Sequence, residues 1–224
     1  MKFNLNQCPL FAGMSEAEIE ECLLVSQARI VSCPKDTYLF HQGELPRYMM
    51  VLLSGSIVIG NDSLGGKRNI VATFQEHGEM FGEVFLFLNK KEYDYFALAD
   101  STADVLLIPK AFFDVDAVNQ NSFSYRLIAN LLPVFAGKAY YLNQKIRIIS
   151  GASLRQKIAR MLLQHTHSDP DYTFSMNREK MADYLGVARP SLSRELSNMQ
   201  AEGLISLEKR QIRIVDLSAL QEII

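Results

Sequence analysis

The apolar positions in the first half of the chain occur in short runs with turn residues between them. The run at 48–59 is interrupted by Ser54 and Gly55, a pattern typical of a tight hairpin. A loop at 61–67 separates it from the run at 69–74, and two further runs fill 95–109. Short strands at this close spacing predict a β-barrel or jelly roll over residues 38–109.

Helical periodicity flanks this region on both sides. Ser15 and Glu18 have the spacing of a capping box, which predicts a short helix at 15–26. A long helix is predicted at 122–149, where apolar residues recur in steps of four and three. This heptad stripe consists of Ile128, Leu132, Phe135, Ala139, Leu142, Ile146 and Ile149. Pro133 predicts a kink in this helix, or a break near its start.

The segment 177–205 predicts two short helices joined by a sharp turn. Asn177 is a favourable N-cap, and Gly186 suits the left-handed position that ends the first helix. Pro190 fits the first turn of the second helix, where its missing N–H is harmless. Apolar residues then alternate on both sides of Lys209 and Arg210, which predicts a winged hairpin. These alternating residues are Leu204, Ile205, Leu207, Ile212 and Ile214.

The second of these helices has two faces of different chemistry. Leu192, Leu196 and Met199 form an apolar stripe that we expect to pack on the first helix. The opposite arc consists of Arg189, Pro190, Ser191, Ser193, Arg194 and Ser197. An arginine on such an arc can bond a guanine edge through two parallel hydrogen bonds. Ser191 and Arg178 are better placed to hold phosphates.

This arrangement predicts sequence-specific DNA binding by a winged helix-turn-helix. The competing interpretation is an ordinary helical hairpin with a solvated charged face. The heptad stripe of the long helix is the pattern of a coiled-coil seam. A dimer formed along this seam would also match DNA sites with two-fold symmetry. We therefore favour a homodimer over a long helix that packs its stripe on its own barrel.

Length and composition predict a globular protein with three segments. The 224 residues are 48% hydrophobic, enough for two domains with separate cores. We expect a barrel domain at 1–120, a dimerisation helix at 121–149 and a DNA-binding domain at 150–224. The chain contains no run of eighteen apolar residues, and its first residues lack the apolar core of a signal peptide. The expected location is therefore cytoplasmic, without a membrane partner.

Charge is distributed unevenly along the chain. The net charge is −2. Residues 1–149 carry 13 Lys and Arg against 16 Asp and Glu, which gives −3, whereas residues 150–224 carry 10 against 9, which gives +1. The cations for phosphate contacts are therefore local, and DNA affinity should be modest and salt-sensitive.

The three cysteines carry no recognisable cofactor pattern. Cys8, Cys22 and Cys33 are an odd number in a chain expected to be cytosolic, which argues against a disulfide framework. Their spacing does not match zinc or iron–sulfur sites. We expect buried, inert thiols, no iron–sulfur cluster and no bound metal.

The order of barrel, long helix and winged helix-turn-helix resembles the Crp/Fnr family of bacterial transcription regulators. The most specific motifs are YLGVARPSLSREL at 184–196 and GEMFGEVFLF at 78–87. The resemblance implies an α+β fold with a double-stranded β-helix (jelly-roll) barrel, a homodimer, and an effector signal that passes through the long helix. It also implies that Arg189, Ser193 and Arg194 contact bases, and that 165–172 is a possible RNA polymerase contact. Pro190 departs from the acidic residue of several members.

The expected effector site departs further from this family. Cyclic-nucleotide-binding members follow a Gly–Glu pair with an Arg–Ser pair that clamps the cyclic phosphate. Here Gly82 and Glu83 are present, but Tyr93 and Asp94 stand at the clamp positions. A carboxylate repels a phosphate and a phenol offers no bidentate charge-assisted bond, so we predict that cyclic AMP does not bind tightly.

Aromatic residues crowd the predicted effector site instead. The candidate pocket comprises Phe81, Glu83, Phe85, Tyr93, Asp94, Tyr95, Tyr140, Leu142 and Asn143. Such a lining suits a small apolar or aromatic ligand, while the alternative is a filled core without a ligand. Haem is a third alternative, with His41 or His77 as the axial ligand. The sequence therefore does not identify the effector or any cofactor.

Other functions are less consistent with the sequence. Jelly-roll oxygenases need histidines and a carboxylate on barrel strands, but the one His-x-His motif, at His165 and His167, lies outside the predicted barrel. No phosphate-binding loop, nucleophile elbow or Cys/His pair is evident. A ligand-binding regulatory subunit that acts on another protein would not need a winged helix-turn-helix. We therefore predict a regulator and not an enzyme.

Overall fold

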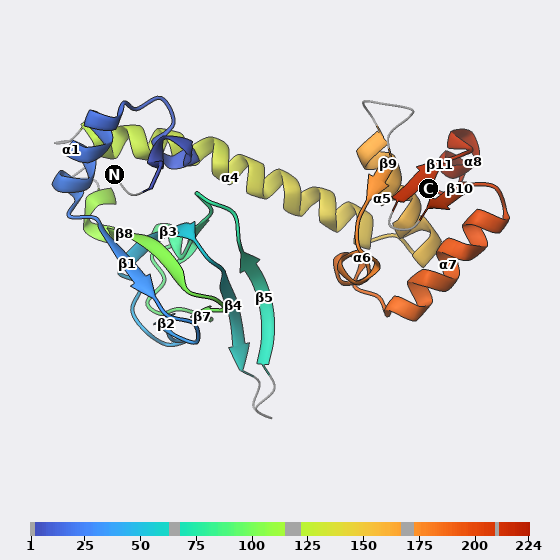
Figure 1. Cartoon of the computed structure of the whole chain (residues 1–224), viewed down its shortest axis with the longest axis horizontal. Helices are drawn as coiled ribbons and strands as arrows, with labels where there is room; N and C mark the ends of the chain where they lie inside the picture. The colour runs from blue at the N-terminus through green and yellow to red at the C-terminus, as the bar shows by residue number, and fades with distance from the viewer. Residues whose placement is uncertain (1–2, 63–67, 115–121, 167–172, 209–210) are drawn as a thin grey trace. The chain divides into compact units, whose positions relative to one another are not determined.

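The computed structural model describes residues 3–62, 68–114, 122–166, 173–208 and 211–224 (Figure 1). The chain forms two compact units, residues 1–135 and 136–224. The boundary lies inside helix α4 (Ser122–Ile149), so this helix contributes to both units. The three segments expected from the sequence, with the helix as a segment of its own, stay a prediction.

Two four-stranded antiparallel sheets form the first unit. One sheet has the strand order β1-β8-β3-β6 and the other β2-β7-β4-β5. The first contains β1 (Arg29–Cys33), β8 (Ala103–Pro109), β3 (Tyr48–Ser54) and β6 (Met80–Phe81). The second contains β2 (Tyr38–Phe40), β7 (Phe96–Ala99), β4 (Ile57–Asp62) and β5 (Arg68–Phe74). This arrangement confirms the predicted jelly-roll architecture.

The tight hairpin expected at Ser54 and Gly55 is wrong. β3 and β4 form on either side of this turn, but β3 pairs with β8 and β4 pairs with β5 and β7. Gly55 has a φ of 88°, and a Cβ there would lie 2.3 Å from the Thr102 carbonyl oxygen. The turn therefore packs against the segment that joins β7 to β8. Each of these two segments carries the chain from one sheet to the other.

Short helices cover the first unit. These are α1 (Glu16–Ser26), α2 (Glu83–Phe87), and the 3-10 turns η1 (Leu5–Gln7), η2 (Pro9–Phe11) and η3 (Lys110–Phe113). The capping box of α1 is confirmed, because Ser15 and Glu18 exchange the expected hydrogen bonds. Helix α2 was not predicted, and it begins at Glu83, directly after Gly82 in a left-handed conformation (φ 79°).

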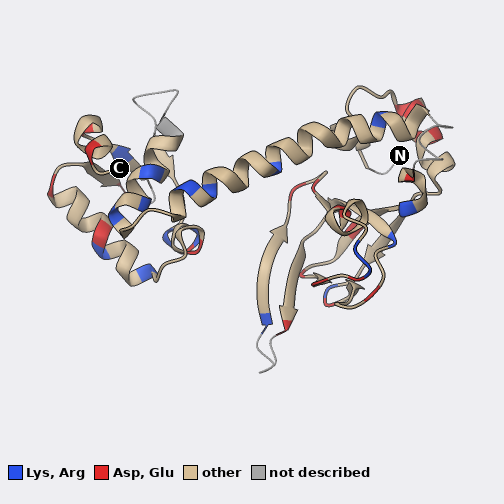
Figure 2. Ribbon diagram, turned by 180° about the vertical axis from the view of Figure 1, so that it is seen from behind, with Lys and Arg blue, Asp and Glu red and all other residues tan. Residues whose placement is uncertain are grey.

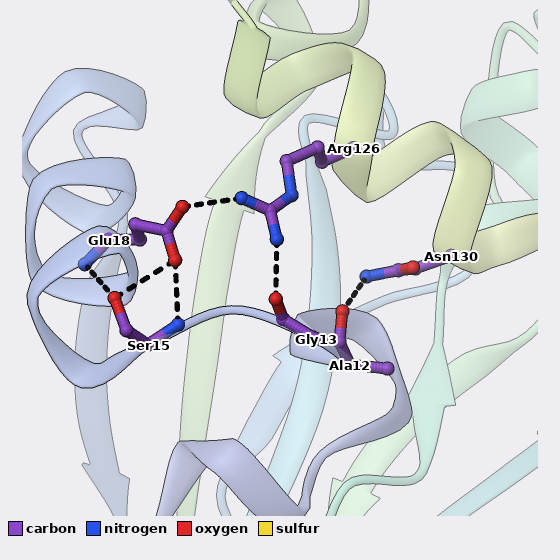
Figure 3. Close-up of polar contacts among 6 residues, drawn as sticks. All are labelled: Ala12, Gly13, Ser15, Glu18, Arg126 and Asn130. Atoms are coloured by element: carbon purple, nitrogen blue, oxygen red, sulfur yellow. Dashed lines mark hydrogen bonds and ion pairs between the residues drawn. The ribbon is translucent and has the colours of Figure 1, made fainter.

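The start of α4 is fixed to the N-terminal segment by a polar cluster (Figure 3). Arg126 Nη1 lies 2.6 Å from Glu18 Oε1, and its Nη2 donates to the Gly13 carbonyl. Asn130 Nδ2 donates to the carbonyl oxygens of Leu10 and Ala12, at 2.8 and 3.0 Å. The acceptors of these bonds are main-chain oxygens of the N-terminal segment. The bonds therefore stabilise the N-terminal turns as well as the helix.

The heptad stripe of α4 is largely exposed. Leu127 and Leu131, which lie on a different row of the helix, are buried in the core of the first unit. On the stripe itself Leu132, Leu142 and Ile146 are 65%, 56% and 57% exposed. Within the first unit, Leu132 is exposed, whereas Phe135 packs against the core and contacts Phe87. Whether the whole stripe packs on its own barrel or on a second copy stays a prediction. The helix continues through Pro133.

The second unit is a helical domain with a three-stranded sheet. Its helices are α5 (Leu154–Thr166), α6 (Arg178–Leu185), α7 (Arg189–Ala201) and α8 (Leu217–Glu222). The sheet has the order β10-β11-β9, with β9 (Thr173–Ser175), β10 (Ile205–Glu208) and β11 (Gln211–Ile214). The predicted wing is confirmed, and β9 and α8 were not predicted. Among the described residues, no helix has the length and apolar character needed to cross a membrane.

Candidate nucleic-acid interface and effector site

Helix α6 begins and ends where the sequence predicted. The Asn177 side chain accepts a hydrogen bond of 3.0 Å from the Glu179 amide, and therefore caps the first turn. Gly186 ends the helix with a φ of 65°, a left-handed conformation that a residue with a Cβ adopts only at a cost. Met181, Ala182 and Leu185 are all buried. The chain thus turns sharply into α7.

Helix α7 separates its two faces as expected. Leu192, Leu196 and Met199 are fully buried in the core of the second unit. The residues of the opposite arc, Arg189, Pro190, Ser191, Ser193, Arg194 and Ser197, are all exposed. The polar donors are therefore presented on a helix whose other face is fixed by packing. This is the geometry that a recognition helix needs to place side chains in a major groove.

The first turn of α7 can also accept an anion. Pro190 occupies the first turn, Ala188 provides no side-chain cap, and the turn contains no acidic residue. The free amides of a helix start carry partial positive charge, so they attract phosphate oxygens. Ser191 lies in the same turn with its side chain exposed. Its predicted phosphate contact agrees with this position but stays a prediction.

The remaining two predicted DNA contacts are more constrained. Arg178 is partly buried at the start of α6, with Nη1 4.0 Å from Met181 Sδ, and burial lowers the pKa of its guanidinium. Ser197 Oγ donates to the Ser193 carbonyl at 3.1 Å. The Ser197 oxygen therefore remains available chiefly as an acceptor. The roles of both residues on DNA stay predictions.

An arginine on α5 binds two carboxylates at α7, and this contact was not predicted from the sequence. Arg155 Nε donates to Glu195 Oε1 at 2.6 Å. Its two terminal nitrogens each donate to one oxygen of Glu202, both at 2.7 Å, in the bidentate geometry that favours arginine. These bonds raise the pKa of Arg155 and lower that of Glu202. We call Arg155, Glu195 and Glu202 the α7 clamp.

Charge in the second unit is mixed rather than concentrated in one block (Figure 2). Cationic and acidic segments alternate along its helices, as the net charge of +1 for residues 150–224 predicts. Two of the carboxylates belong to the α7 clamp, where the single positive charge of Arg155 offsets one of their two negative charges. The charged residues of the exposed arc are Arg189 and Arg194.

Part of the predicted effector pocket is assembled in the barrel. Tyr93 is buried and stacks on Phe40, with ring centroids 3.7 Å apart, and Phe85 meets it edge-on at 5.1 Å. Phe85 also contacts Tyr95, at 6.4 Å. Burial raises the pKa of Tyr93 to about 12, so this phenol is neutral near pH 7. Phe40 was not predicted, because it lies 53 residues before Tyr93 in the sequence.

The two carboxylates of the predicted pocket lie in different environments. Glu83 is buried at the start of α2, whereas Asp94 is exposed and lies 3.5 Å from Lys90 Nζ. Phe81 is buried and packs on Phe74 at 5.3 Å. Asp94 is therefore a surface ion-pair residue, while Glu83 and Phe81 belong to the interior.

Three predicted pocket residues lie in the second unit. Tyr140, Leu142 and Asn143 have exposed side chains on α4, and Tyr140 accepts a hydrogen bond of 2.7 Å from Gln144. Their contribution to an effector site in the barrel stays a prediction.

The cysteines are buried, and the two described histidines of the barrel contact other protein groups. Cys8, Cys22 and Cys33 are buried, as predicted, and burial raises the pKa of Cys8 and Cys22 to about 11. The two ring nitrogens of His77 lie 2.9 Å from the Leu53 oxygen and 3.0 Å from the Asn4 oxygen. His77 Nε2 also lies 3.3 Å from Cys8 Sγ, so the structure contains a Cys/His pair that was not expected from the sequence. His41 stacks on Tyr38 at 4.3 Å. No group of three potential metal ligands occurs among the described residues. His167 and residues 168–172 of the possible polymerase contact lie outside them.

These features define a class of protein, a winged helix-turn-helix DNA-binding protein with a second, jelly-roll domain. Residues 156–223 match the Crp-like helix-turn-helix domain, and residues 30–115 match the cyclic nucleotide-binding domain. The chain belongs to the Crp/Fnr family of transcription regulators.

Relatives span almost the whole chain. The cyclic AMP receptor protein of Thermus thermophilus is 25% identical over 215 residues, which is 96% of each chain. The CRP-like cAMP-activated global transcriptional regulator of Mycobacterium tuberculosis is 23% identical over 224 residues, also 96% of each. The c-di-GMP responsive global regulator CLP of Xanthomonas campestris has a similar fold, with a TM-score of 0.58 and 16% identity. That comparison covers 90% of this chain and 100% of CLP. The M. tuberculosis protein and CLP are named as regulators, and the T. thermophilus protein is named as a cyclic AMP receptor.

Proposed function

We propose that this chain is a homodimeric, sequence-specific transcription regulator that reads two-fold DNA sites through α7. The observation that carries the proposal is the separation of faces on α7, with three fully buried apolar residues opposite an exposed Arg/Ser arc. Arg189, Ser193 and Arg194 are the proposed base contacts. Such contacts discriminate bases by about 1–3 kcal/mol each.

The proposed dimer forms along the exposed stripe of α4. Leu132, Leu142 and Ile146 are large apolar side chains at a strict heptad spacing, and all three are more than half exposed. A second copy of the same helix would cover such a stripe by knobs-into-holes packing. Two copies of α7 would then address two half-sites, centred about one helical turn of DNA or a multiple of it apart.

Selection from random duplex DNA tests the proposed function. The purified protein is incubated with a random library, and the bound fragments are sequenced. We expect enrichment of a two-fold symmetric sequence. Sequences without symmetry would contradict the dimeric reader, and the absence of any enrichment would contradict sequence-specific recognition.

We further propose that cyclic AMP does not control this protein. A cyclic phosphate at the clamp positions would meet the neutral, buried phenol of Tyr93 and the carboxylate of Asp94. Neither supplies the positive charge that a phosphate requires. Two relatives are named after cyclic AMP, but the side chains at these two positions do not favour the same ligand here.

The barrel interior leaves two proposals that one measurement separates. Either a small apolar or aromatic molecule binds against Tyr93 and Phe85, or these rings fill the space themselves. Native mass spectrometry of the purified protein detects a retained ligand by its added mass. A visible spectrum of the same sample detects haem, which the contacts of His77 with two main-chain oxygens disfavour.

A further inference from the structure

A cavity of about 670 Å³ lies inside the second unit, between the end of α4, α5 and α8. Gln144 and Arg147 line it from one face of α4. Arg160, Leu163 and Gln164 line it from α5, and Leu217 from the first position of α8. A volume of this size is in the range of small-molecule sites. The rest of the lining consists of Tyr140, Ser150, Gln221 and Ile224. None of the lining residues is a proposed DNA contact, and one of them, Tyr140, was also predicted for the effector site.

The charged side chains that line the cavity have one sign. Its charged lining residues are Arg147 and Arg160, and no Asp or Glu side chain lines it. In the described part of the chain, no ion pair joins either guanidinium to a carboxylate. The acidic partners that neutralise Arg155 on the same helix are therefore lacking here. Two arginines at one cavity favour an anion.

One of the arginines also has a structural bond. Arg160 Nη1 donates to the Arg147 carbonyl oxygen at 2.8 Å. That carbonyl lies in the last turn of α4, where main-chain oxygens lack helical partners. The bond uses one of the five N–H donors of a guanidinium. Arg160 can therefore hold the end of α4 and still bind a ligand oxygen.

The other walls of the cavity are neutral or apolar. Leu163 is buried beneath it, and Leu217 is 43% exposed although it is a large apolar residue. Gln144 and Gln164 add amide groups that can donate or accept. A ligand that satisfies this lining has an anionic group at the arginines and an apolar portion against the leucines.

We propose that this cavity is a binding site for a small organic anion with an apolar portion. Its carboxylate, sulfonate or phosphate group is held by Arg147 and Arg160, and its apolar part packs on Leu163 and Leu217. A bound ligand would contact three helices at once. It would therefore stiffen the attachment of α4 to α5, the helix whose Arg155 holds α7. The proposal is independent of DNA binding and of the barrel ligand.

Titration with 8-anilinonaphthalene-1-sulfonate tests the site on the full chain without DNA. This probe carries a sulfonate on an aromatic body, and its fluorescence rises on binding. We expect saturation at one probe per chain and about tenfold weaker binding in Arg147→Gln, since a hydrogen bond to a charged group contributes about 1.5–3 kcal/mol. Arg147→Gln retains the main-chain oxygen that Arg160 needs. The control Arg29→Gln removes the same charge from an exposed strand of the barrel and should bind like the unmodified protein.

Two further measurements keep the test decisive. N-phenyl-1-naphthylamine has the same ring system without the sulfonate, and we expect it to bind about tenfold more weakly. Ser150→Glu places a carboxylate in the lining and should weaken the sulfonate probe as Arg147→Gln does. Circular dichroism confirms that each variant is folded. Unchanged affinity in both folded variants, or equal affinity for the uncharged probe, would overturn the proposal.

Discussion

The barrel and the helix-turn-helix of this protein each match the domain model of their kind, but they differ in how they present polar chemistry. On α7 the arginines and serines face solvent, and the apolar residues behind them are fully buried. In the barrel, Tyr93 stands where the sequence resemblance expects the phosphate-clamping arginine, and it is buried and stacked on Phe40. We therefore propose that the chain retains the side chains for DNA binding and lacks those for a cyclic phosphate.

The difference shows what a fold can and cannot imply. The two sheets of the barrel depend on apolar strands, whereas Tyr93 lies in the loop after α2 and belongs to neither sheet. A recognition helix depends on exposed side chains that pack on nothing, so their identity reports on binding rather than on stability. We therefore assign DNA binding from residues, and we do not assign cyclic AMP binding from the barrel.

The largest expected effect is that of Leu142→Asp. A charge in the α4 stripe would be buried in the proposed dimer without a partner, so we expect monomers by light scattering and a loss of tight DNA binding. Asn143→Asp adds the same charge at the next, exposed position outside the stripe and should leave the dimer intact. A dimer of unchanged mass in Leu142→Asp would place the interface elsewhere.

Arg194→Ala should weaken base discrimination without affecting assembly. Loss of one bidentate contact costs about 1–3 kcal/mol, which is about a five- to 150-fold loss of preference for the selected sequence over a scrambled one. Fluorescence anisotropy with both duplexes measures the ratio. Arg29→Ala on the barrel is the control for charge. Equal discrimination by Arg194→Ala and the unmodified protein would remove this residue from the base contacts.

Arg155→Gln should have a smaller effect that depends on pH. Arg155 lowers the pKa of Glu202 in the folded state, so the clamp stabilises the protein above the unfolded glutamate pKa of about 4.3. This stabilisation is lost as the pH falls through the lower, folded pKa. We expect the variant to melt at a lower temperature at pH 7, by a small amount because the pair is partly exposed.

Melting followed by circular dichroism between pH 7 and pH 3 checks this expectation. The difference in melting temperature between the two proteins should shrink as the solution becomes acidic. A difference that stays constant over this range would show that Arg155 acts through packing and not through its charge.

The smallest expected effect is the response to cyclic AMP. Isothermal titration of the unmodified protein should give no measurable heat of binding, because Tyr93 and Asp94 provide no cation for the phosphate. The double variant Tyr93→Arg/Asp94→Ser restores the clamp chemistry, and measurable binding by this variant alone would sharpen the contrast with α7. Micromolar binding by the unmodified protein would contradict our account of the barrel.

Local patterns in the sequence predicted the DNA-binding unit well. The caps of α6, the buried stripe of α7 and the wing follow from residues within a turn or a strand of one another. The α7 clamp could not be predicted, because Arg155 and Glu202 are 47 positions apart and an exposed glutamate has many possible partners. The position of Phe40 against Tyr93 was hidden for the same reason.

Strand pairing in the barrel could not be predicted from the turn residues. Ser54 and Gly55 predicted a turn, and a turn is present, but the partner of β3 is β8, about fifty residues further along the chain. A turn signal specifies a change of direction and not the sheet that receives the next strand. Helix α2 was missed because its five residues are too few for a helical period and follow the glycine of a predicted loop.

The most direct test of the central claim compares three duplexes that carry the selected site. One has both half-sites, one has a single half-site scrambled, and one has both scrambled. We expect the dimer to bind the complete site about a thousandfold or more tightly than the fully scrambled duplex. Its affinity for the duplex with one half-site should lie between these two values. Equal affinity for the complete and half-scrambled duplexes would contradict two-fold recognition by paired copies of α7.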